Sequence, residues 1–254
     1  MTQKDPFKLR LRRGDSLHGF FIGHASPALV EMVGYAGFDF AIMDQEHGPI
    51  DKAALEGMLR AADAVGITPI VRIPSASTDA ILSVLDLGAV GILVPHVTDA
   101  AVARHIVEQA YYMPQGKRGI SSFGRGAHYG LWKGKYLQDA NNLTTVITMV
   151  EDAEAVGQAG AIAAVPGVDA VFVGPSDLGA SMGHIGERDH PELLAAIVDI
   201  AKAVKAVGGV GLATTAQTHH DVPGLNELGY SMICHSTTTT MARGLKALYA
   251  DLKL

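Results

Sequence analysis

Two carboxylates, Glu151 and Asp177, each follow a short apolar run and lie beside small or turn-forming residues. Ionised carboxylates in apolar surroundings repel one another and are costly to desolvate. A hard divalent cation removes both costs, because carboxylate oxygens hold it together with water and substrate oxygens. All-oxygen ligation favours Mg²⁺ or Mn²⁺, with Co²⁺ as a third candidate, over Zn²⁺, which prefers His or Cys. The alternative is that the two acids cap helices or pair with an arginine.

Arg72 ends another apolar run, and a buried guanidinium in such a position needs an anionic partner. That partner is either a neighbouring acid, Asp44 or Glu46, or the carboxylate of a substrate held by the fork of the guanidinium. His47 lies beside these acids and is the expected general acid–base, because histidine titrates near neutral pH. Three further histidines follow apolar runs and are secondary candidates for substrate contact: His24, His96 and His235.

An arginine, a divalent cation and a base together describe a site for a 2-oxo acid. The acid would chelate the cation through its carboxylate and keto oxygens, and the cation would stabilise an enolate. Formation or cleavage of the neighbouring carbon–carbon bond passes through this enolate, so the residues predict aldol chemistry. The turn before Asp177 supplies the residues that we expect to contact the substrate: Gly174, Pro175 and Ser176.

Other reaction classes lack the residues that they need. No lysine ends an apolar run, which disfavours a Schiff-base mechanism. The single cysteine, Cys234, excludes an intrachain disulfide, and a lone thiol in an apolar run is usually a small hydrophobe. The sequence contains no G-x-S-x-G nucleophile motif, and no glycine-rich phosphate-binding motif follows the first apolar run.

Charge and hydropathy limit the partners of the protein. The formal net charge of −6 argues against nucleic acid, because phosphate binding needs clustered Lys and Arg. No run approaches the ~18 apolar residues of a transmembrane helix, and the chain does not begin with an apolar targeting segment. We therefore expect a cytoplasmic protein that binds neither nucleic acid nor membranes.

The candidate site residues follow apolar runs that alternate with segments of helical composition. The nearly continuous apolar character of these runs is typical of strands in a parallel sheet covered on both faces. The eight runs are 17–22, 38–43, 68–73, 90–94, 145–150, 168–173, 209–213 and 231–234. The helical segments are 26–35, 51–65, 78–87, 99–112, 152–165, 191–207, 218–228 and 239–252.

Eight such units in 254 residues fit the α/β class, and a closed (β/α)8 TIM barrel better than a doubly wound open sheet. We expect a single barrel domain over residues 1–254, with a long excursion at about 113–142. The carboxyl ends of barrel strands carry the chemistry, so the residues above should converge there. The excursion is either a surface segment with a short helix or a segment that folds over the site or a neighbouring subunit.

The chain resembles the HpcH/HpaI aldolases, which are class II, metal-dependent pyruvate aldolases acting on 4-hydroxy-2-oxo acids. The matching segments are FDFAIMDQEHG at 38–48, VRIP at 71–74, LDLGAVGILVP at 85–95, YYMPQGKRG at 111–119, VE at 150–151, GPSDLGASMG at 174–183 and HPE at 190–192. The resemblance covers about residues 15–250 and is specific because these motifs occur jointly.

The resemblance implies roles for several of the residues already singled out. Glu151 and Asp177 would be the metal ligands, and Arg72 would contact the bound 2-oxo acid. His47 would work in proton transfer, with Asp86 of a neighbouring subunit as its partner. Such aldolases are homo-oligomers, either trimers or hexamers built from two trimers, and they exchange their last helix between neighbours.

The resulting prediction is a carbon–carbon lyase that makes or cleaves 4-hydroxy-2-oxo acids from an aldehyde and the enolate of pyruvate or hydroxypyruvate. Met149 departs from the family pattern, which often has Gln there, and this affects the identity of the substrate more than the reaction class. Two alternatives stay open: a barrel that binds a 2-oxo acid without catalysis, and a related lyase that acts on acyl-CoA thioesters.

Overall fold

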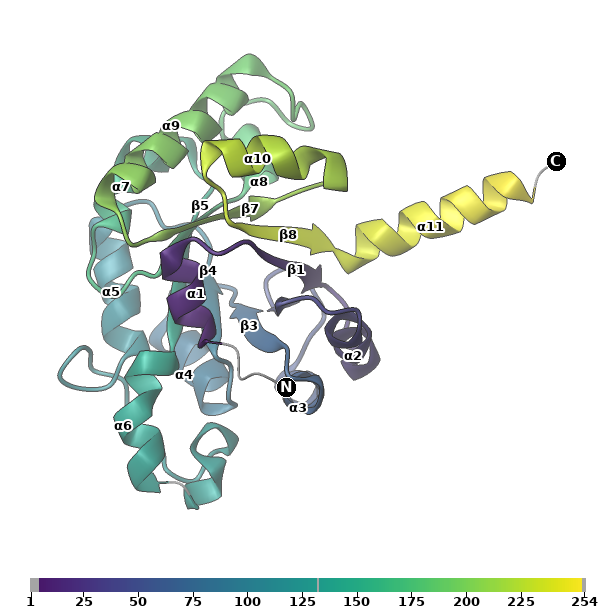
Figure 1. Ribbon diagram of the computed structural model, residues 1–254. Helices are drawn as coiled ribbons and strands as arrows, with labels where there is room; N and C mark the ends of the chain where they lie inside the picture. The colour runs from purple at the N-terminus through teal and green to yellow at the C-terminus, as the bar shows by residue number, and fades with distance from the viewer. Residues whose placement is uncertain (1–4, 132, 253–254) are drawn as a thin grey trace.

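The chain forms a closed barrel of parallel strands that follow one another in sequence order (Figure 1). This computed structural model describes residues 5–131 and 133–252; the start of the chain, on which the targeting expectation rests, lies partly outside them. The strands are β1 (Leu17–Ile22), β2 (Phe40–Asp44), β3 (Thr68–Arg72), β4 (Gly91–Val94), β5 (Thr145–Val150), β6 (Ala170–Val173), β7 (Gly211–Thr215) and β8 (Met232–Ser236). The predicted (β/α)8 architecture is confirmed.

Helices alternate with the strands and cover the outside of the barrel. The α-helices are α1 (Phe7–Arg13), α2 (Pro27–Tyr35), α3 (Lys52–Val65), α4 (Thr78–Asp86), α5 (Ala100–Ala110), α6 (Lys133–Leu143), α7 (Ala159–Ala163), α8 (Pro175–Ser181), α9 (Pro191–Val207), α10 (Val222–Leu228) and α11 (Thr237–Asp251). The 3₁₀ segments are η1 (Arg125–Gly130), η2 (Ala153–Gln158) and η3 (His219–Asp221). Within the described ranges, no helix is both long and apolar enough to cross a membrane.

Side-chain caps begin several helices. Ser26 and Asp51 accept backbone N–H bonds in the first turns of α2 and α3. The single helix expected over 152–165 is instead divided into η2 and α7. Gly157 and Gly160 lie at this division, and each glycine disfavours a continuous helix by about 1 kcal/mol.

Side chains alternate between the inside and the outside of the barrel, because successive residues of a strand point to opposite faces. The outward-facing ones, such as Val71 and Ile92, pack against the surrounding helices. The inward-facing ones form a separate apolar cluster that fills the barrel and includes Phe40, Ile70 and Ile147. The barrel is therefore a packed core, and a ligand can bind only beyond the ends of its strands.

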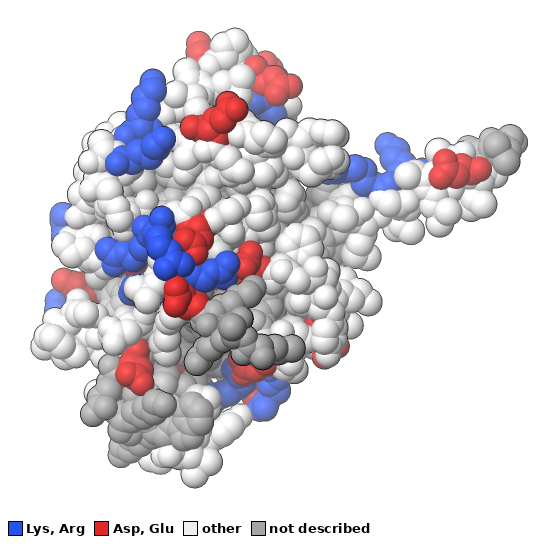
Figure 2. Space-filling model, in the orientation of Figure 1, with Lys and Arg blue, Asp and Glu red and all other residues white. Residues whose placement is uncertain are grey.

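Helix α1, which the sequence pattern did not predict, closes the amino-terminal end of the barrel. Phe7 and Leu11, one turn apart on α1, are buried in the inner cluster, and Phe7 packs edge-to-face on Phe40 with ring centroids 5.9 Å apart. Basic residues lie on the other side of α1, where Lys8 is 3.4 Å from the buried Asp169. Figure 2 shows these cations gathered with acidic side chains over α1.

The segment between α5 and β5 packs against the carboxyl end of α4. Arg118 donates to Oδ1 of Asp86 at 2.7 Å, and Arg125 donates to the backbone carbonyl of Leu87 at 2.7 Å. Helices run back from the carboxyl ends of the strands, so the end of α4 lies at the amino-terminal end of the barrel. The excursion therefore lies near the face opposite the expected site, and any contact with a neighbouring subunit stays a prediction.

We predict that Gly19→Ala strongly destabilises the protein. A Cβ on Gly19, in β1, would lie 2.2 Å from the backbone oxygen of Phe40, which belongs to β2 and cannot move aside cheaply. Such overpacking should lower the free energy of unfolding by about 3 kcal/mol or more, as measured by urea denaturation. Gly224→Ala is the matched control, because its Cβ on α10 meets no atom within 4 Å. Equal stability of the two variants would contradict this packing.

Candidate active site

A cavity of about 700 Å³ lies beyond the carboxyl ends of the strands. Because successive residues of a strand point to opposite faces, four inward-facing positions lie at or just after the ends of β2, β3, β5 and β6. They are Asp44, Arg72, Glu151 and Gly174, respectively. The floor of the cavity consists of apolar side chains that continue the barrel interior: Phe21, Met149 and Phe172. The cavity therefore combines a polar rim with an apolar floor, as a site for a small organic acid needs.

Most of the predicted site residues meet at this cavity. His47, Arg72 and Asp177 line it, together with the turn that the sequence singled out: Gly174, Pro175 and Ser176. Glu151 lies immediately beside this turn, because a Cβ placed on Gly174 would come within 2.7 Å of Oε2 of Glu151. The glycine thus leaves space in front of the buried carboxylate. His24, a secondary candidate, also lines the cavity.

Two acidic side chains hold Arg72. Its Nε and Nη2 donate to Oδ1 and Oδ2 of Asp44 at 2.9 and 2.7 Å, and its Nη1 lies 3.1 Å from Oε2 of Glu46. Asp44 and Arg72 are partners in the register of β2 and β3, so the pairing of these strands positions the two side chains for this bidentate contact. Burial alone would lower the pKa of Arg72 and raise that of Asp44, but their hydrogen bonds reverse both shifts.

Both acids that the sequence offered as partners of Arg72 are therefore its contacts. These contacts do not use the whole guanidinium, which has five N–H donors. Within the described residues, Nη1 makes an ion pair with Glu46 but no hydrogen bond. The group also lies over the ring of Phe21, 4.8 Å from its centroid, at the wall of the cavity. Arg72 can therefore still bind a substrate carboxylate.

Glu151 is a buried acid among other acids, with 2% of its side chain exposed. Its Oε1 accepts the backbone N–H of His96 at 3.0 Å. Burial, and to a smaller extent the nearby carboxylates of Asp177 and Glu46, raise the pKa of Glu151 to about 7, although His96 acts in the opposite direction. Among the described residues, no lysine or arginine comes within ion-pair distance of Glu151 or Asp177.

One group of potential metal ligands beside this cavity consists of Glu46, His96 and Glu151, and Asp177 lies close enough to Glu151 to raise its pKa. Asp177 lies in the first turn of α8, yet within the described ranges it accepts no hydrogen bond, so it does not act as a helix cap. Glu46 is a third acid at this place, and its Oε2 is already ion-paired with Nη1 of Arg72. A cation would offset both the repulsion and the desolvation of these carboxylates, and oxygen ligands suit Mg²⁺ or Mn²⁺.

His96 is a site residue that the sequence ranked below His47. It follows β4 with a left-handed φ of 53°, and its Nδ1 and Nε2 lie 3.2 Å from Asp152 and 3.7 Å from Glu46. Burial acts to lower the pKa of His96, but the surrounding acids outweigh it and raise this pKa. Its position at a strand end was the only signal, and its acidic partners were not predictable from that position.

Arg188 also lines the cavity, although it was not predicted from the sequence. It lies in the loop between α8 and α9 and donates to the hydroxyl of Ser176 at 2.7 Å. No strand-end position and no motif marks this residue. Only the path of the loop brings it to the rim.

Asp86 is not brought to His47 within one chain. Asp86 is the last residue of α4 and is bonded to Arg118 at the amino-terminal end of the barrel. His47 lies at the opposite end, where 62% of its side chain is exposed. Contact between His47 and the partner subunit's Asp86 therefore stays a prediction.

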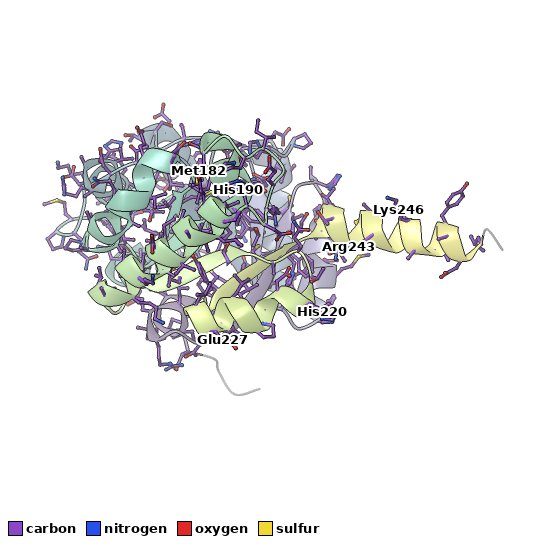
Figure 3. The ribbon with its side chains drawn as sticks, turned by 90° about the horizontal axis from the view of Figure 1, so that it is seen from above. Met182, His190, His220, Glu227, Arg243 and Lys246 are labelled. Carbon is purple, nitrogen blue, oxygen red and sulfur yellow. The ribbon has the colours of Figure 1, made fainter. Side chains whose placement is uncertain are left out.

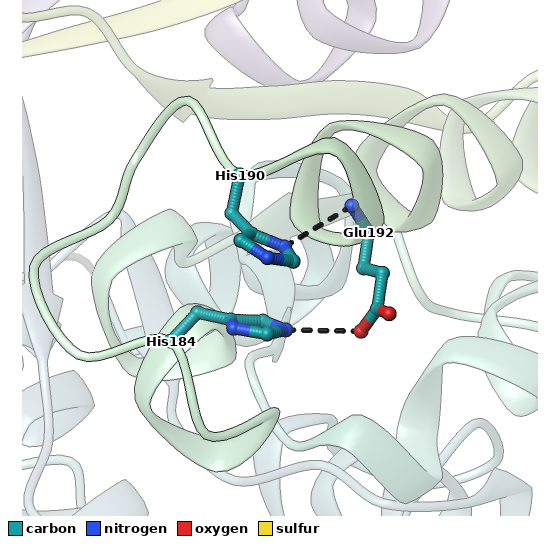
Figure 4. Close-up of side chains that lie close together, drawn as sticks. All are labelled: His184, His190 and Glu192. Carbon is teal, nitrogen blue, oxygen red and sulfur yellow. Dashed lines mark hydrogen bonds and ion pairs between the residues drawn. The ribbon is translucent and has the colours of Figure 1, made fainter.

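A second group of potential metal ligands lies where α9 begins (Figure 4): His184, His190 and Glu192. His184 Nε2 is 2.9 Å from Glu192 Oε2, and His190 Nδ1 accepts the backbone N–H of Glu192. The imidazoles are stacked with centroids 3.4 Å and planes 16° apart, so their in-plane nitrogen lone pairs do not converge on one ion. As arranged, this group caps α9, and the metal fits better at Glu151.

The sequence is similar to those of known aldolases. A profile of the family described as HpcH/HpaI aldolase/citrate lyase matches residues 17–243. The chain is 41% identical over 198 residues to a 2-dehydro-3,6-dideoxy-6-sulfogluconate aldolase of Pseudomonas putida, covering 78% of this chain and 77% of that protein. It is 38% identical over 213 residues to a hydroxypyruvate/pyruvate aldolase of Pseudomonas aeruginosa, covering 84% and 80%.

Solved structures share the fold over almost the whole chain. An HpcH/HpaI aldolase/citrate lyase family protein from Burkholderia cenocepacia J2315 has a TM-score of 0.92 and 32% identity, covering 97% of this chain and 98% of that one. The citrate synthase SbnG has a TM-score of 0.88 and 32% identity, covering 98% and 97%.

We predict that Glu151→Gln weakens Mn²⁺ binding at least about tenfold, because the variant keeps the shape of the side chain but removes the charge of a ligand. Titration of free Mn²⁺ by electron paramagnetic resonance measures the affinity, and circular dichroism shows that the fold is retained. Glu192→Gln, in the stacked-histidine group, is the matched control and should bind Mn²⁺ like the wild type. Loss of affinity in Glu192→Gln alone would place the ion at α9 instead.

Proposed function

Because the chain belongs to the HpcH/HpaI aldolase/citrate lyase family, we propose that it is a divalent-metal-dependent aldolase acting on 4-hydroxy-2-oxo acids. This carbon–carbon lyase joins the enolate of pyruvate or hydroxypyruvate to an aldehyde, or cleaves the product. One observation carries the proposal: Glu151, a buried acid with no Lys or Arg partner among the described residues, lies with Glu46 and His96 and close to Asp177 beside the cavity that Arg72 lines.

Arg72 binds and orients the 2-oxo acid. Asp44 fixes the guanidinium through the strand register, so the group is already in place before a substrate arrives. A substrate carboxylate would add charge-assisted hydrogen bonds to the remaining N–H donors. The apolar floor formed by Met149 and Phe172 suits the methyl group of pyruvate.

Glu151 and Asp177 hold the cation, with Glu46 close by. When bound, a divalent cation supplies positive charge that stabilises the negative charge developing on the keto oxygen of the substrate. Mg²⁺ and Mn²⁺ suit these oxygen ligands, and Co²⁺ is a third candidate. The cation also favours the ionised form of Glu151, whose pKa burial otherwise raises to about 7.

His47 transfers the proton at C3 of the donor. It lines the cavity, and its Nε2 lies 3.8 Å from Oε2 of Glu46. The partner subunit's Asp86 would hold the imidazole in the orientation that proton transfer needs. This pairing requires that the carboxyl end of one barrel meets the amino-terminal end of another.

A homo-oligomer, a trimer or a hexamer, is supported by helix α11. This helix extends away from the barrel (Figure 1) and exposes apolar side chains along its length. They include Met241, Leu245, Leu248 and Leu252, whose spacing gives one stripe. An exposed stripe of this kind is costly in water, and packing on the barrel of a neighbouring subunit would bury it.

We predict that the protein with Mg²⁺ or Mn²⁺ exchanges the methyl protons of pyruvate for deuterium in the absence of any aldehyde. Enolate formation precedes carbon–carbon bond formation, so the exchange isolates the first step. Proton NMR of pyruvate in D₂O measures it, and EDTA should abolish it. A barrel that only binds a 2-oxo acid would give no exchange, and an acyl-CoA lyase would turn over thioesters without exchanging pyruvate.

We also predict that His47→Asn and Asp86→Asn are each nearly inactive alone but restore activity when co-expressed. If Asp86 serves the neighbouring subunit, random assembly gives about a quarter of the sites both native residues. Turnover per site in oligomers carrying two different affinity tags measures the recovery. Co-expression of two differently tagged His47→Asn chains is the control and should stay inactive. Mixed oligomers as inactive as their parents would show that the two residues do not cooperate across subunits.

A further inference from the structure

A side cavity of about 260 Å³ adjoins the reaction cavity. The two cavities share Arg188, Thr215 and Ser236 as lining residues. The other polar side chains of the side cavity come from the end of β8, the loop after β7 and the start of α11, and include Gln217, His235 and Arg243. Because the two cavities share these lining residues, they lie next to one another at the carboxyl end of the barrel.

The side cavity carries an excess of positive charge. Arg188 and Arg243 line it, and no carboxylate of the described residues does. These two differ from Arg72, Arg118 and Arg125, each of which forms an ion pair with an acidic side chain. Within the described part of the chain, neither Arg188 nor Arg243 has an acidic partner at ion-pair distance.

Neutral oxygens hold both guanidinium groups in place. Arg188 donates to the hydroxyl of Ser176, and its Nε and Nη1 lie 3.0 and 2.8 Å from the Gln217 side-chain oxygen once that amide is oriented to suit its donors. Arg243 donates to the backbone carbonyl of Gln217 at 2.5 Å. Gln217 therefore brings the two arginines together, and their positive charges remain uncompensated.

The remaining titratable groups around the cavity do not cancel this charge. Burial lowers the pKa of His235, and the neighbouring His18 and Arg243 lower it further, which favours its neutral form. Asp221 accepts the backbone N–H groups of Gln217 and Thr218 and does not line the cavity. Glu187 does not line the side cavity; it lines a neighbouring cavity that Arg188 also lines.

The position of Arg243 is fixed by the barrel. Arg243 lies near the start of α11, where this helix leaves the barrel (Figure 3). Ser236 caps the first turn by accepting the N–H of Thr239, and the hydroxyl of Thr237 donates to the carbonyl of Phe21 at 3.0 Å. The arginine pair is therefore built before a ligand binds.

We propose that Arg188 and Arg243 bind an anionic group at the far end of the acceptor aldehyde, so that the enzyme prefers aldehydes ending in a carboxylate, sulfonate or phosphate. This inference rests on the proposed aldolase function and names the substrate class of the same site. Guanidinium groups bind such oxyanions with paired hydrogen bonds. A cavity of about 260 Å³ accommodates a small anionic group with a short chain.

The test compares acceptors and variants with pyruvate as the donor. The acceptors are 4-oxobutanoate and 2-oxoethanesulfonate, which are anionic, and butanal and glycolaldehyde, which are neutral. We expect the wild type to have a higher kcat/KM for the anionic acceptors. Arg188→Met and Arg243→Met should each reduce the ratio of anionic to neutral kcat/KM about tenfold or more, because each removes hydrogen bonds to a charged group. Sulfate should compete with the anionic acceptors and not with the neutral ones.

Two control variants remove the same charge elsewhere. Lys246→Met changes the same helix outside the cavity, and Arg104→Met changes an exposed cation on α5; both should keep the wild-type ratio. A wild type without preference, or Arg188→Met and Arg243→Met variants that keep it, would overturn the inference. Deuterium exchange into pyruvate tests the aldolase function separately from the acceptor preference. Exchange without a preference for anionic acceptors refutes only this inference, whereas the absence of exchange refutes the proposed function itself.

Discussion

The site depends on negative charge that the barrel buries at the end of β5. Glu151 is almost inaccessible, and both Asp177 and Glu46 act on it, so its ionised form is unfavourable without a positive partner. Arg72 does not supply that partner, because Asp44 occupies two of its donors. The backbone N–H of His96 provides only a partial charge, and the ring of His96, whose Nδ1 lies 3.7 Å from Oε1 of Glu151, also faces Asp152 and Glu46. The proposed divalent cation, held by Glu151 and Asp177, would satisfy these carboxylates together.

The barrel supplies this arrangement through strand register and side-chain alternation. Asp44 and Arg72 meet because β2 and β3 are paired at those positions, and Gly174 leaves room in front of Glu151 because it has no Cβ. Asp44 and Arg72 lie on strands, and Glu151 and Gly174 directly follow strands, so these groups are held rigidly, as an orienting and metal-binding set requires. The residues proposed to bind the acceptor, including Arg188, lie in loops and on helices outside the strands. The reaction class is thus set by the strands, and the acceptor preference by the connections.

The sequence alone predicted the barrel and most of the residues around its mouth, because apolar runs mark buried strands and polar residues mark their ends. It left the partner of Arg72 open, since Asp44 and Glu46 are both close to the strand end and only the pairing of strands distinguishes their contacts. It missed Arg188, because no motif marks a loop that folds back to the rim. Helix α1 was missed because it is short and mostly basic, with Phe7 as one of its two buried residues.

The most direct test is a crystal structure of the protein soaked with Mn²⁺ and pyruvate, with anomalous difference maps recorded at the manganese edge. We predict one strong peak coordinated by Glu151 and Asp177, with the pyruvate carboxylate on Arg72. A peak between His184 and Glu192 alone, or a pyruvate bound away from Arg72, would contradict the account. Either result would leave the barrel fold in place and remove the chemistry assigned to its mouth.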